Sequence, residues 1–165
     1  MTPRSTLELT LFIRAAQPPK VAAMETEIVR IGPAQMGLLR RVAEDVFDGE
    51  INARRLANYL MTPGNLMVLA VTDGEVVGQV RGVIHRHPDL PTELYIDNLG
   101  VTPDRRREGI ATRLLDDLLG WGRDMGCEEA WVGTEVDNDA ARTLYERRGS
   151  EAQALVLYFW EFDEN

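Results

Sequence analysis

Three consecutive arginines, Arg105, Arg106 and Arg107, stand between an apolar stretch at residues 94–101 and a helix-like stretch that begins at Gly109. The first turn of a helix exposes unpaired backbone N–H groups at the positive end of its dipole. Glycine lets an anion approach that backbone closely, and arginine donates paired hydrogen bonds to phosphate oxygens. These residue types in this order predict a pyrophosphate-binding turn between a strand and a helix. An ordinary solvated turn is the alternative if charge alone is considered.

The spacing Arg106-x-x-Gly109-x-Ala111 resembles the coenzyme A pyrophosphate loop of the GCN5-related N-acetyltransferases, the GNAT superfamily. The motifs of the Walker loop and of the dinucleotide-binding fingerprint are both missing. The resemblance implies acetyl-coenzyme A as the donor co-substrate. It also implies a set of residues that hold the donor's pyrophosphate: Arg106, Arg107, Gly109, Ile110, Ala111 and Thr112.

A second block, EVDNDAARTLYERRG at residues 135–149, resembles the other signature of the same superfamily. The resemblance implies that Asn138 hydrogen-bonds the pantetheine arm and that Tyr145 lies near the thioester sulfur. Tyr145 would then protonate the departing thiolate as a general acid. For an isolated tyrosine, half-buried packing against a helix is the alternative interpretation.

The strand pattern breaks at Asn98-Leu99-Gly100, immediately before the arginines. A glycine at the end of a strand indicates a bulge or a close backbone approach. In the resembled superfamily this strand is bulged and splays from its neighbour, which implies that Leu99, Gly100 and Val101 offer backbone groups to the pantetheine. A strand end without a ligand is the alternative.

Three carboxylates lie near expected strand ends: Glu93, Asp97 and Glu135. An amine acceptor is protonated at neutral pH and must lose a proton before it attacks, so a carboxylate can serve as base directly or through water. Glu135 is the first candidate and Asp97 the second. Strand alternation puts Asp97 and Asn98 on opposite faces unless a bulge intervenes. A solvated surface role is the alternative for each carboxylate.

Metal binding is not expected. His85 and His87 form a His-x-His pair at a strand end, but the sequence assigns them no third ligand. The single cysteine, Cys127, is far away in sequence and is expected to be a buried structural thiol. One cysteine also excludes internal disulfides and fits a reducing, cytoplasmic compartment.

The fold expected from periodicity is an α/β (α+β) mixed sheet covered by helices. The resemblance implies a GNAT-like fold, with a mostly antiparallel sheet, a splayed strand pair and four flanking helices. Expected helices cover residues 36–47, 52–60, 109–125 and 140–148. Expected strands cover residues 27–31, 66–72, 76–85, 94–101, 130–135 and 156–162. The last strand is aromatic and is expected to be buried, to pair a homodimer or to line the acceptor cleft.

Charge is divided unevenly along the chain. Net charge is −9, and three basic residues against one acid give residues 1–23 a charge of +2, which leaves −11 for residues 24–165. This balance argues against a nucleic-acid partner and suits a cationic substrate. No stretch is long and apolar enough to predict a membrane span. Residues 1–23 are expected to be a disordered extension, with Met24 as an alternative start, and residues 24–165 a single acetyltransferase domain.

A closer resemblance is to the aminoglycoside (gentamicin-type) 3-N-acetyltransferases. It rests on four segments: RIGPAQM at residues 30–36, DVF at 45–47, ELYIDNLGV at 93–101 and the block at 135–149. It implies acetyl transfer to an amine of a small polycationic sugar, with Tyr145 as acid and Glu135 or Asp97 as base. The alternatives are an acetyltransferase for a protein N-terminus, a lysine or a polyamine, and a non-catalytic acyl-coenzyme A binding module.

Overall fold

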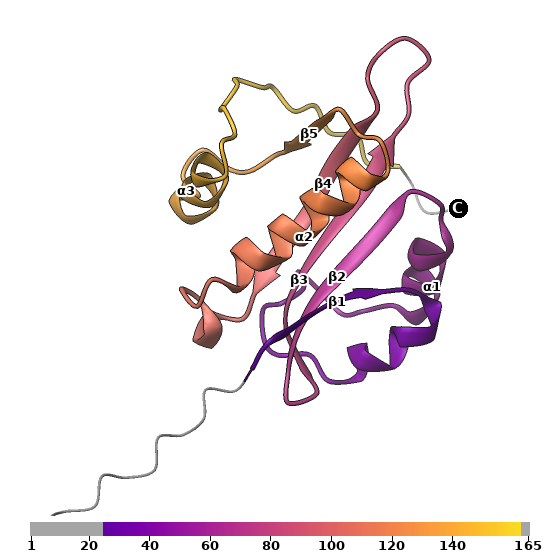
Figure 1. Cartoon of the computed structure of the whole chain (residues 1–165), viewed down its shortest axis with the longest axis vertical. Coiled ribbons are helices and arrows are strands. Elements are labelled where there is room, and N and C mark those ends of the chain that lie inside the picture. Colours follow the sequence, from indigo (N-terminus) through magenta and orange to yellow (C-terminus); the bar gives the residue numbers. More distant parts are fainter. Residues whose placement is uncertain (1–24, 163–165) are drawn as a thin grey trace, which may run out of the picture.

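A five-stranded mixed sheet forms the centre of the computed structural model, which describes residues 25–162 (Figure 1). The strands lie in chain order: β1 (Glu27–Ile31), β2 (Asn65–Thr72), β3 (Glu75–His85), β4 (Glu93–Val101) and β5 (Glu129–Val132). The first four are antiparallel, and β5 runs parallel to β4. The mostly antiparallel mixed sheet predicted from the sequence is therefore confirmed. The expected extension at residues 1–23 lies outside the described residues.

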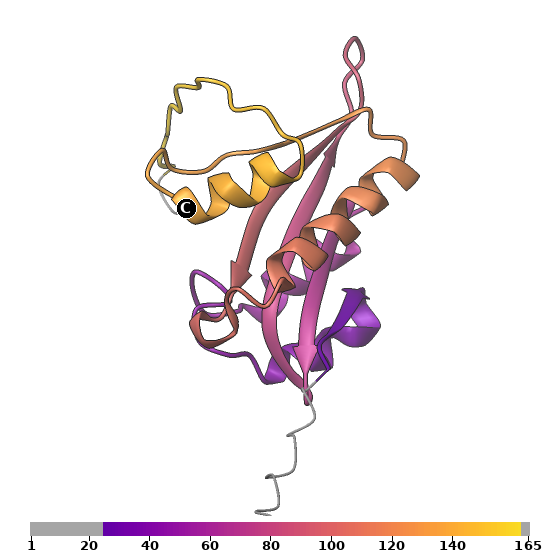
Figure 2. The ribbon, with the colours of Figure 1, turned by 60° about the vertical axis from the view of Figure 1, so that its left-hand side comes forward.

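Helices cover both faces of this sheet (Figure 2). The long helix α2 crosses one face, while α1 and the 3-10 helix η1 pack on the other. A short 3-10 turn, η2, precedes α2, and α3 follows β5. Their bounds are η1 (Pro33–Arg40), α1 (Ala53–Met61), η2 (Pro103–Arg105), α2 (Ile110–Asp124) and α3 (Asp139–Arg147). Within residues 25–162, no helix combines the length and apolarity that a membrane span requires.

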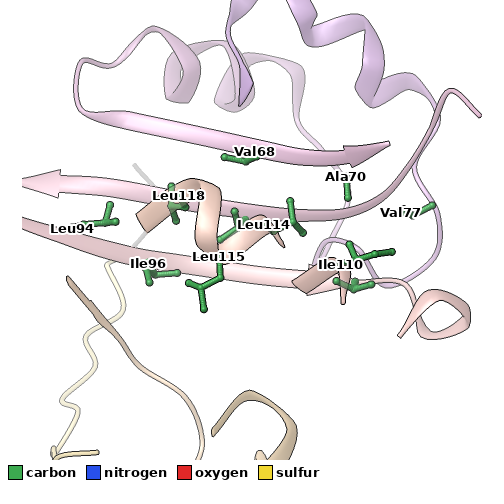
Figure 3. Packing of buried hydrophobic residues seen from close by; sticks show 11 residues of the cluster. Val68, Ala70, Val77, Leu94, Ile96, Ile110, Leu114, Leu115 and Leu118 are labelled. Carbon is green, nitrogen blue, oxygen red and sulfur yellow. The ribbon is translucent and has the colours of Figure 1, made fainter. Parts of the chain in front are cut away.

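The apolar stripe of α2 packs against the sheet as its spacing predicts (Figure 3). Leu114 and Leu118 are fully buried, and the helix approaches β3 so closely that a Cβ on Gly82 would lie 2.9 Å from Cδ1 of Leu118. Real Cβ atoms almost never come so close, so glycine permits this approach. The first turn of α2 is held against the end of β4, because Ile110 and Val101 are buried in the same core.

The second core lies on the opposite face and joins α1, η1 and residues 42–47 to β2. Asn52 caps α1 by accepting hydrogen bonds from the backbone N–H groups of Arg54 and Arg55, as its residue type predicts. The turn Asp73-Gly74 joins β2 to β3 as a tight hairpin with both residues at positive φ, a conformation that an Asp-Gly pair adopts readily.

The helix expected over residues 36–47 is wrong in extent and type. The structure has a 3-10 helix that ends at Arg40, followed by a parallel bridge between Val42 and Val76. Val76 donates its N–H to the Arg41 carbonyl at 2.9 Å and accepts from the Ala43 N–H at 2.9 Å. These contacts with the start of β3 replace the helical hydrogen bonds of residues 41–43. Helical spacing of apolar residues cannot reveal such a distant partner.

The closing strand expected over residues 156–162 is also wrong. That segment has no regular secondary structure, and its large apolar side chains are exposed. β-Propensity is expressed only when a strand pairs and packs, and within residues 25–162 this segment pairs with no strand. Two expected boundaries also differ. β5 ends at Val132 rather than at Glu135. Helix α2 ends at Asp124 rather than at Met125, which is its C-cap and is 41% exposed.

Candidate functional site

A cleft of about 1020 Å³ opens where β4 and β5 separate. The two strands pair only from Glu93 to Ile96 and from Glu129 to Val132. Beyond Ile96 the edge of β4 has no strand beside it, and α3 stands apart from the sheet (Figure 1). The volume reaches the upper end of the range usual for small-molecule sites. The splayed strand pair expected from the resemblance is therefore present, and it opens a large cavity.

The predicted site residues converge on this cleft, with Gly100 and Glu93 as the exceptions. The end of β4, the arginine turn, the start of α2, the segment after β5 and α3 all contribute to the walls. The predicted residues that line the cleft are Asp97, Leu99, Val101, Arg106, Arg107, Gly109, Ile110, Ala111, Thr112, Glu135, Asn138 and Tyr145.

In the turn between β4 and α2, which we call the arginine turn, the side chains of Arg105, Arg106 and Arg107 differ in the contacts they make. Arg105 pairs with Glu108 at 2.8 Å and donates to the Thr26 hydroxyl at 3.2 Å, so it braces the turn. Arg106 donates through Nε to the Val101 carbonyl at 3.3 Å, which ties the turn to the end of β4. Within residues 25–162, Arg107 forms no ion pair and lines the cleft. Arg107 can therefore bind an anion without losing another partner.

The start of α2 is open to the same cleft. Gly109 occupies the N-cap position at φ +78° and provides no side-chain cap. The first backbone bond of the helix runs from the Arg113 N–H to the Gly109 carbonyl at 3.1 Å. The preceding N–H groups, those of residues 110–112, therefore have no carbonyl within the helix. Arg107 is also left-handed, at φ +66°, and left-handed residues in a turn direct successive N–H groups into an anion-binding concavity.

The β-bulge of β4 lies one residue before the position suggested by the sequence. Arg81 pairs with Asn98 and Gly82 with Ile96, so Asp97 is the extra residue. This bulge lets Asp97 and Asn98 both line the cleft despite being neighbours. Gly100 serves close packing instead, because a Cβ there would overlap the carbonyl oxygen of Val46.

A polar network behind the bulge was not anticipated from the sequence. Gln79 is fully buried and donates to the Val46 carbonyl at 3.2 Å and to the side-chain oxygen of Asn98. Asn98 in turn donates to Asp48 at 2.9 Å. Asp48 thereby joins the cleft wall as a third carboxylate. The only sequence signal was a polar Gln79 within an apolar strand.

The carboxylates differ in their surroundings. Oδ2 of Asp97 lies 3.5 Å from Nε of Arg81, whereas Glu135 is exposed and forms no ion pair within residues 25–162. Glu93, the remaining candidate from the sequence, does not line the cleft. It lies at the other end of β4, beside His87 and Trp131. Of the predicted carboxylates in the cleft, Asp97 is therefore paired with an arginine, and Glu135 has no ion-pair partner within residues 25–162.

Helix α3 carries the two remaining predicted residues. Asn138 caps the helix, because its side-chain oxygen accepts the Ala141 N–H at 3.1 Å, and this leaves its amide N–H₂ available as a donor. Tyr145 packs partly against the α2 core, and this burial raises the pKa of its phenol. The phenol therefore stays protonated at neutral pH, as a proton donor must be. Cys127 lies outside the cleft, and burial raises the pKa of its thiol, which disfavours the reactive thiolate.

The sequence is similar to known acetyltransferases. Residues 35–149 match the sequence model of the acetyltransferase (GNAT) family. An aminoglycoside N(6')-acetyltransferase type 1 of Acinetobacter genomosp. 13 is 31% identical over 65 residues, which is 39% of this chain and 44% of that protein. An uncharacterised N-acetyltransferase of Mycobacterium tuberculosis (strain ATCC 25618 / H37Rv) is 28% identical over 102 residues, or 62% of this chain and 63% of that protein. The matches thus span roughly half the length of these curated relatives.

Comparison with solved structures supports the same fold. AAC(6')-Iy in complex with the bisubstrate analogue CoA-S-monomethyl-acetylneamine superposes with a TM-score of 0.70 at 20% sequence identity. The match covers 84% of this chain and 99% of that chain. At this identity the likeness establishes the arrangement of strands and helices, and chemistry must be argued from the residues in the cleft.

Proposed function

The chain belongs to the acetyltransferase (GNAT) family, and from the geometry of its cleft we propose that it transfers an acetyl group from acetyl-coenzyme A to a primary amine of a small cationic substrate. The observation that carries this proposal is the divergence of β4 from β5 beside the uncapped start of α2. That divergence exposes strand backbone for an extended ligand, and the helix start offers N–H groups to its phosphates.

We assign the donor to the half of the cleft nearest α2. The N–H groups of residues 110–112, with Arg106 and Arg107 beside them, supply donors and positive charge for a pyrophosphate. The β4 edge at Leu99 and Val101, free of β5, can pair with the amide groups of the pantetheine arm. The free amide of Asn138 adds a donor from the opposite wall. The fit supports coenzyme A as the ligand.

Tyr145 is our candidate for the general acid. Its position on α3 places it in the same cleft as the β4 edge, and burial keeps its phenol protonated. When the amine attacks the thioester carbonyl and the C–S bond breaks, the phenol can donate its proton to the thiolate. A backbone N–H of the free β4 edge can stabilise the developing oxyanion.

The acceptor is assigned to the acidic half of the cleft. Asp97 precedes Val101 by four residues of strand, or about 13 Å, so Asp97 lies away from the turn of Arg105, Arg106 and Arg107 that follows β4. Asp48, Asp97 and Glu135 together attract a cation. Glu135 is the first candidate to accept the ammonium proton, because Arg81 already compensates Asp97.

Within the class of small cationic amines, an aminoglycoside is the acceptor we propose. The Acinetobacter relative is named as an aminoglycoside N(6')-acetyltransferase, and a structural neighbour holds an analogue built on acetylneamine. The sequence resemblance suggested the 3-amino group, whereas these relatives are named for the 6'-amino group. The carboxylates of the cleft, Asp48, Asp97 and Glu135, suit either amine, so product analysis must assign the position of the acetyl group.

Two alternatives remain as outcomes of the same test. A protein N-terminus, a lysine side chain or a polyamine would use the same donor site with a different acceptor. A non-catalytic acyl-coenzyme A binding module would keep the arginine turn and have no use for Tyr145. The presence of Tyr145 and three carboxylates in one cleft favours an enzyme over a binding module.

We also propose that the chain acts as a homodimer whose second copy covers residues 155–162. Seven large apolar side chains in this segment have between 71% and 91% of their surface exposed. β5 is the last strand of the sheet, so its outer edge has unpaired backbone groups. A segment of high β-propensity and a free strand edge on the same chain complement each other between two copies.

The proposed activity is tested by thiol release from acetyl-coenzyme A in the presence of aminoglycosides, spermidine, small amines and lysine peptides. We expect rapid release with aminoglycosides, and mass spectrometry with NMR of the product then assigns the 3-amino or 6'-amino position. Release only with peptides or polyamines would replace the acceptor and keep the donor. Donor binding with no release across the panel would favour the binding module.

A further inference from the structure

The β3–β4 hairpin brings three potential metal ligands together at the end of the sheet remote from the arginine turn. His85 is the last residue of β3 and lies directly opposite Glu93, the first residue of β4, in the strand register. His87 follows in the connection between the strands. The donor atoms of His85, His87 and Glu93 all lie within 4.8 Å of one another. The sequence assigned no third ligand to the His-x-His pair, and the strand register supplies it.

The distances and donor types suit a tetrahedral transition-metal ion. Nε2 of His87 lies 3.3 Å from Oε2 of Glu93. Two ligand atoms about 2.0–2.1 Å from zinc at tetrahedral angles are about 3.3 Å apart, so this pair already has the spacing of two ligands. Two imidazoles and one carboxylate form a donor set that zinc prefers, whereas calcium and magnesium prefer oxygen ligands.

Neighbouring side chains orient these ligands. The indole Nε1 of Trp131, on β5, donates to Oε2 of Glu93 at 3.2 Å. The ring of His85 stacks on Tyr95 with 5.7 Å between centroids, and the rings of His85 and His87 meet edge to face. Partners of this kind hold the ligands of metal sites in productive orientations. The cluster is therefore supported on three strand segments.

The cluster is only partly covered. The exposed fraction is 32% for the His87 side chain and 21% for the Glu93 side chain. An ion can therefore enter from solvent, and a water molecule can complete its coordination. None of the three ligands lines the large cleft. Glu93 lies four strand residues, or about 13 Å, from Asp97, too far for a bound ion to touch the reacting groups there.

We propose that His85, His87 and Glu93 bind a zinc ion with a solvent molecule in the fourth position. The ion would join the two ends of the β3–β4 connection. It would also fix Glu93, which begins the short stretch where β4 and β5 remain paired. Zinc would therefore stabilise the closed end of the strand pair from which the cleft opens, without taking part in acetyl transfer.

The experiment uses the full chain without a histidine tag, because the tag would itself bind zinc. His85 and His87 are then the only histidines in the sample. After chelator treatment and dialysis, zinc chloride is titrated by calorimetry, and the midpoint of thermal unfolding is measured with and without zinc. We expect one ion per chain and a higher midpoint with zinc. We expect His87→Ala and Glu93→Gln to weaken zinc binding at least about tenfold and to lose the shift in midpoint.

Two matched variants serve as controls. Glu129→Gln removes the carboxylate that faces Glu93 across the β4–β5 pair, and Cys127→Ser removes the only thiol. Both should bind zinc like the unaltered chain, and removal of zinc should leave thiol release unchanged. Equal zinc affinity in His87→Ala, loss of binding in Cys127→Ser, or no binding at all would each overturn the proposal.

Discussion

Nε of Arg81 lies 3.5 Å from Oδ2 of Asp97, and this ion pair sits at the β-bulge that turns Asp97 toward the cleft. Arg81 is largely covered, and within residues 25–162 its Nε has no hydrogen-bond partner besides this electrostatic contact. A carboxylate held by a cation attracts a substrate ammonium group less strongly than a free one does. The two candidate bases proposed from the sequence are therefore unequal in this structure.

Glu135→Gln should consequently lower kcat more than Asp97→Asn. Glu135 has no cationic partner within the described residues, so its loss removes the better proton acceptor, and a reduction of about 100-fold is expected for a general base. Asp97→Asn should mainly raise KM for the cationic acceptor. Steady-state kinetics at neutral pH with the best acceptor of the panel measures both effects. The reverse order of kcat values would assign the base to Asp97.

The pH dependence of turnover should report the phenol of Tyr145. An acid is active while protonated, and burial raises the pKa of this phenol above its ordinary value. Turnover should therefore persist as pH rises past about 10, the usual tyrosine pKa, and decline only at higher pH. Tyr145→Phe should lower kcat and abolish this alkaline decline. Tyr158→Phe, which alters an exposed tyrosine, is the matched control and should leave the profile unchanged.

Arg107→Gln should weaken the donor and leave the acceptor site intact. A charge-assisted hydrogen bond contributes about 1.5–3 kcal/mol, which corresponds to a rise of about 10-fold to 150-fold in KM for acetyl-coenzyme A. Acetyl-pantetheine lacks the pyrophosphate, so its KM should be the same in both proteins. Arg123→Gln, at the far end of α2, is the control. An equal loss with acetyl-pantetheine would contradict the role of Arg107.

The closing segment should control the oligomeric state. Phe159→Asp places a charge among the exposed aromatic side chains, where a second copy would have to bury it at high cost. Light scattering coupled to gel filtration should show a dimer for the unaltered chain and a monomer for the variant. Met61→Asp changes another exposed apolar residue and should remain dimeric. A monomer in every case would disprove the proposed dimer.

Much of the fold follows from local signals in the sequence. Asn52 caps α1 through its own neighbours, Asp73-Gly74 forms a hairpin by backbone preference, and the arginine turn runs into α2 at Gly109. The motifs that supply the candidate site could also be recognised, because each is a short run of residues that are neighbours in the sequence. These features depend on residues that are close together along the chain.

The remaining differences arise from contacts between distant residues. Val42 leaves the helical pattern because Val76 pairs with it, and the bulge falls at Asp97 because Arg81 takes Asn98 as its partner. The hydrogen bond from Asn98 to Asp48 likewise joins residues 50 positions apart. Helical and strand periodicities describe one segment at a time, so they carry no information about such partners.

We propose above all that the cleft between β4 and β5 binds acetyl-coenzyme A and that Tyr145 then assists acetyl transfer. The most direct test measures donor affinity by calorimetry and thiol release with the best acceptor, for the unaltered chain and for Tyr145→Phe side by side. We predict similar donor affinity and a reduction of about 100-fold or more in kcat for the variant. Unchanged thiol release in Tyr145→Phe, or no donor binding by the unaltered chain, would contradict the account.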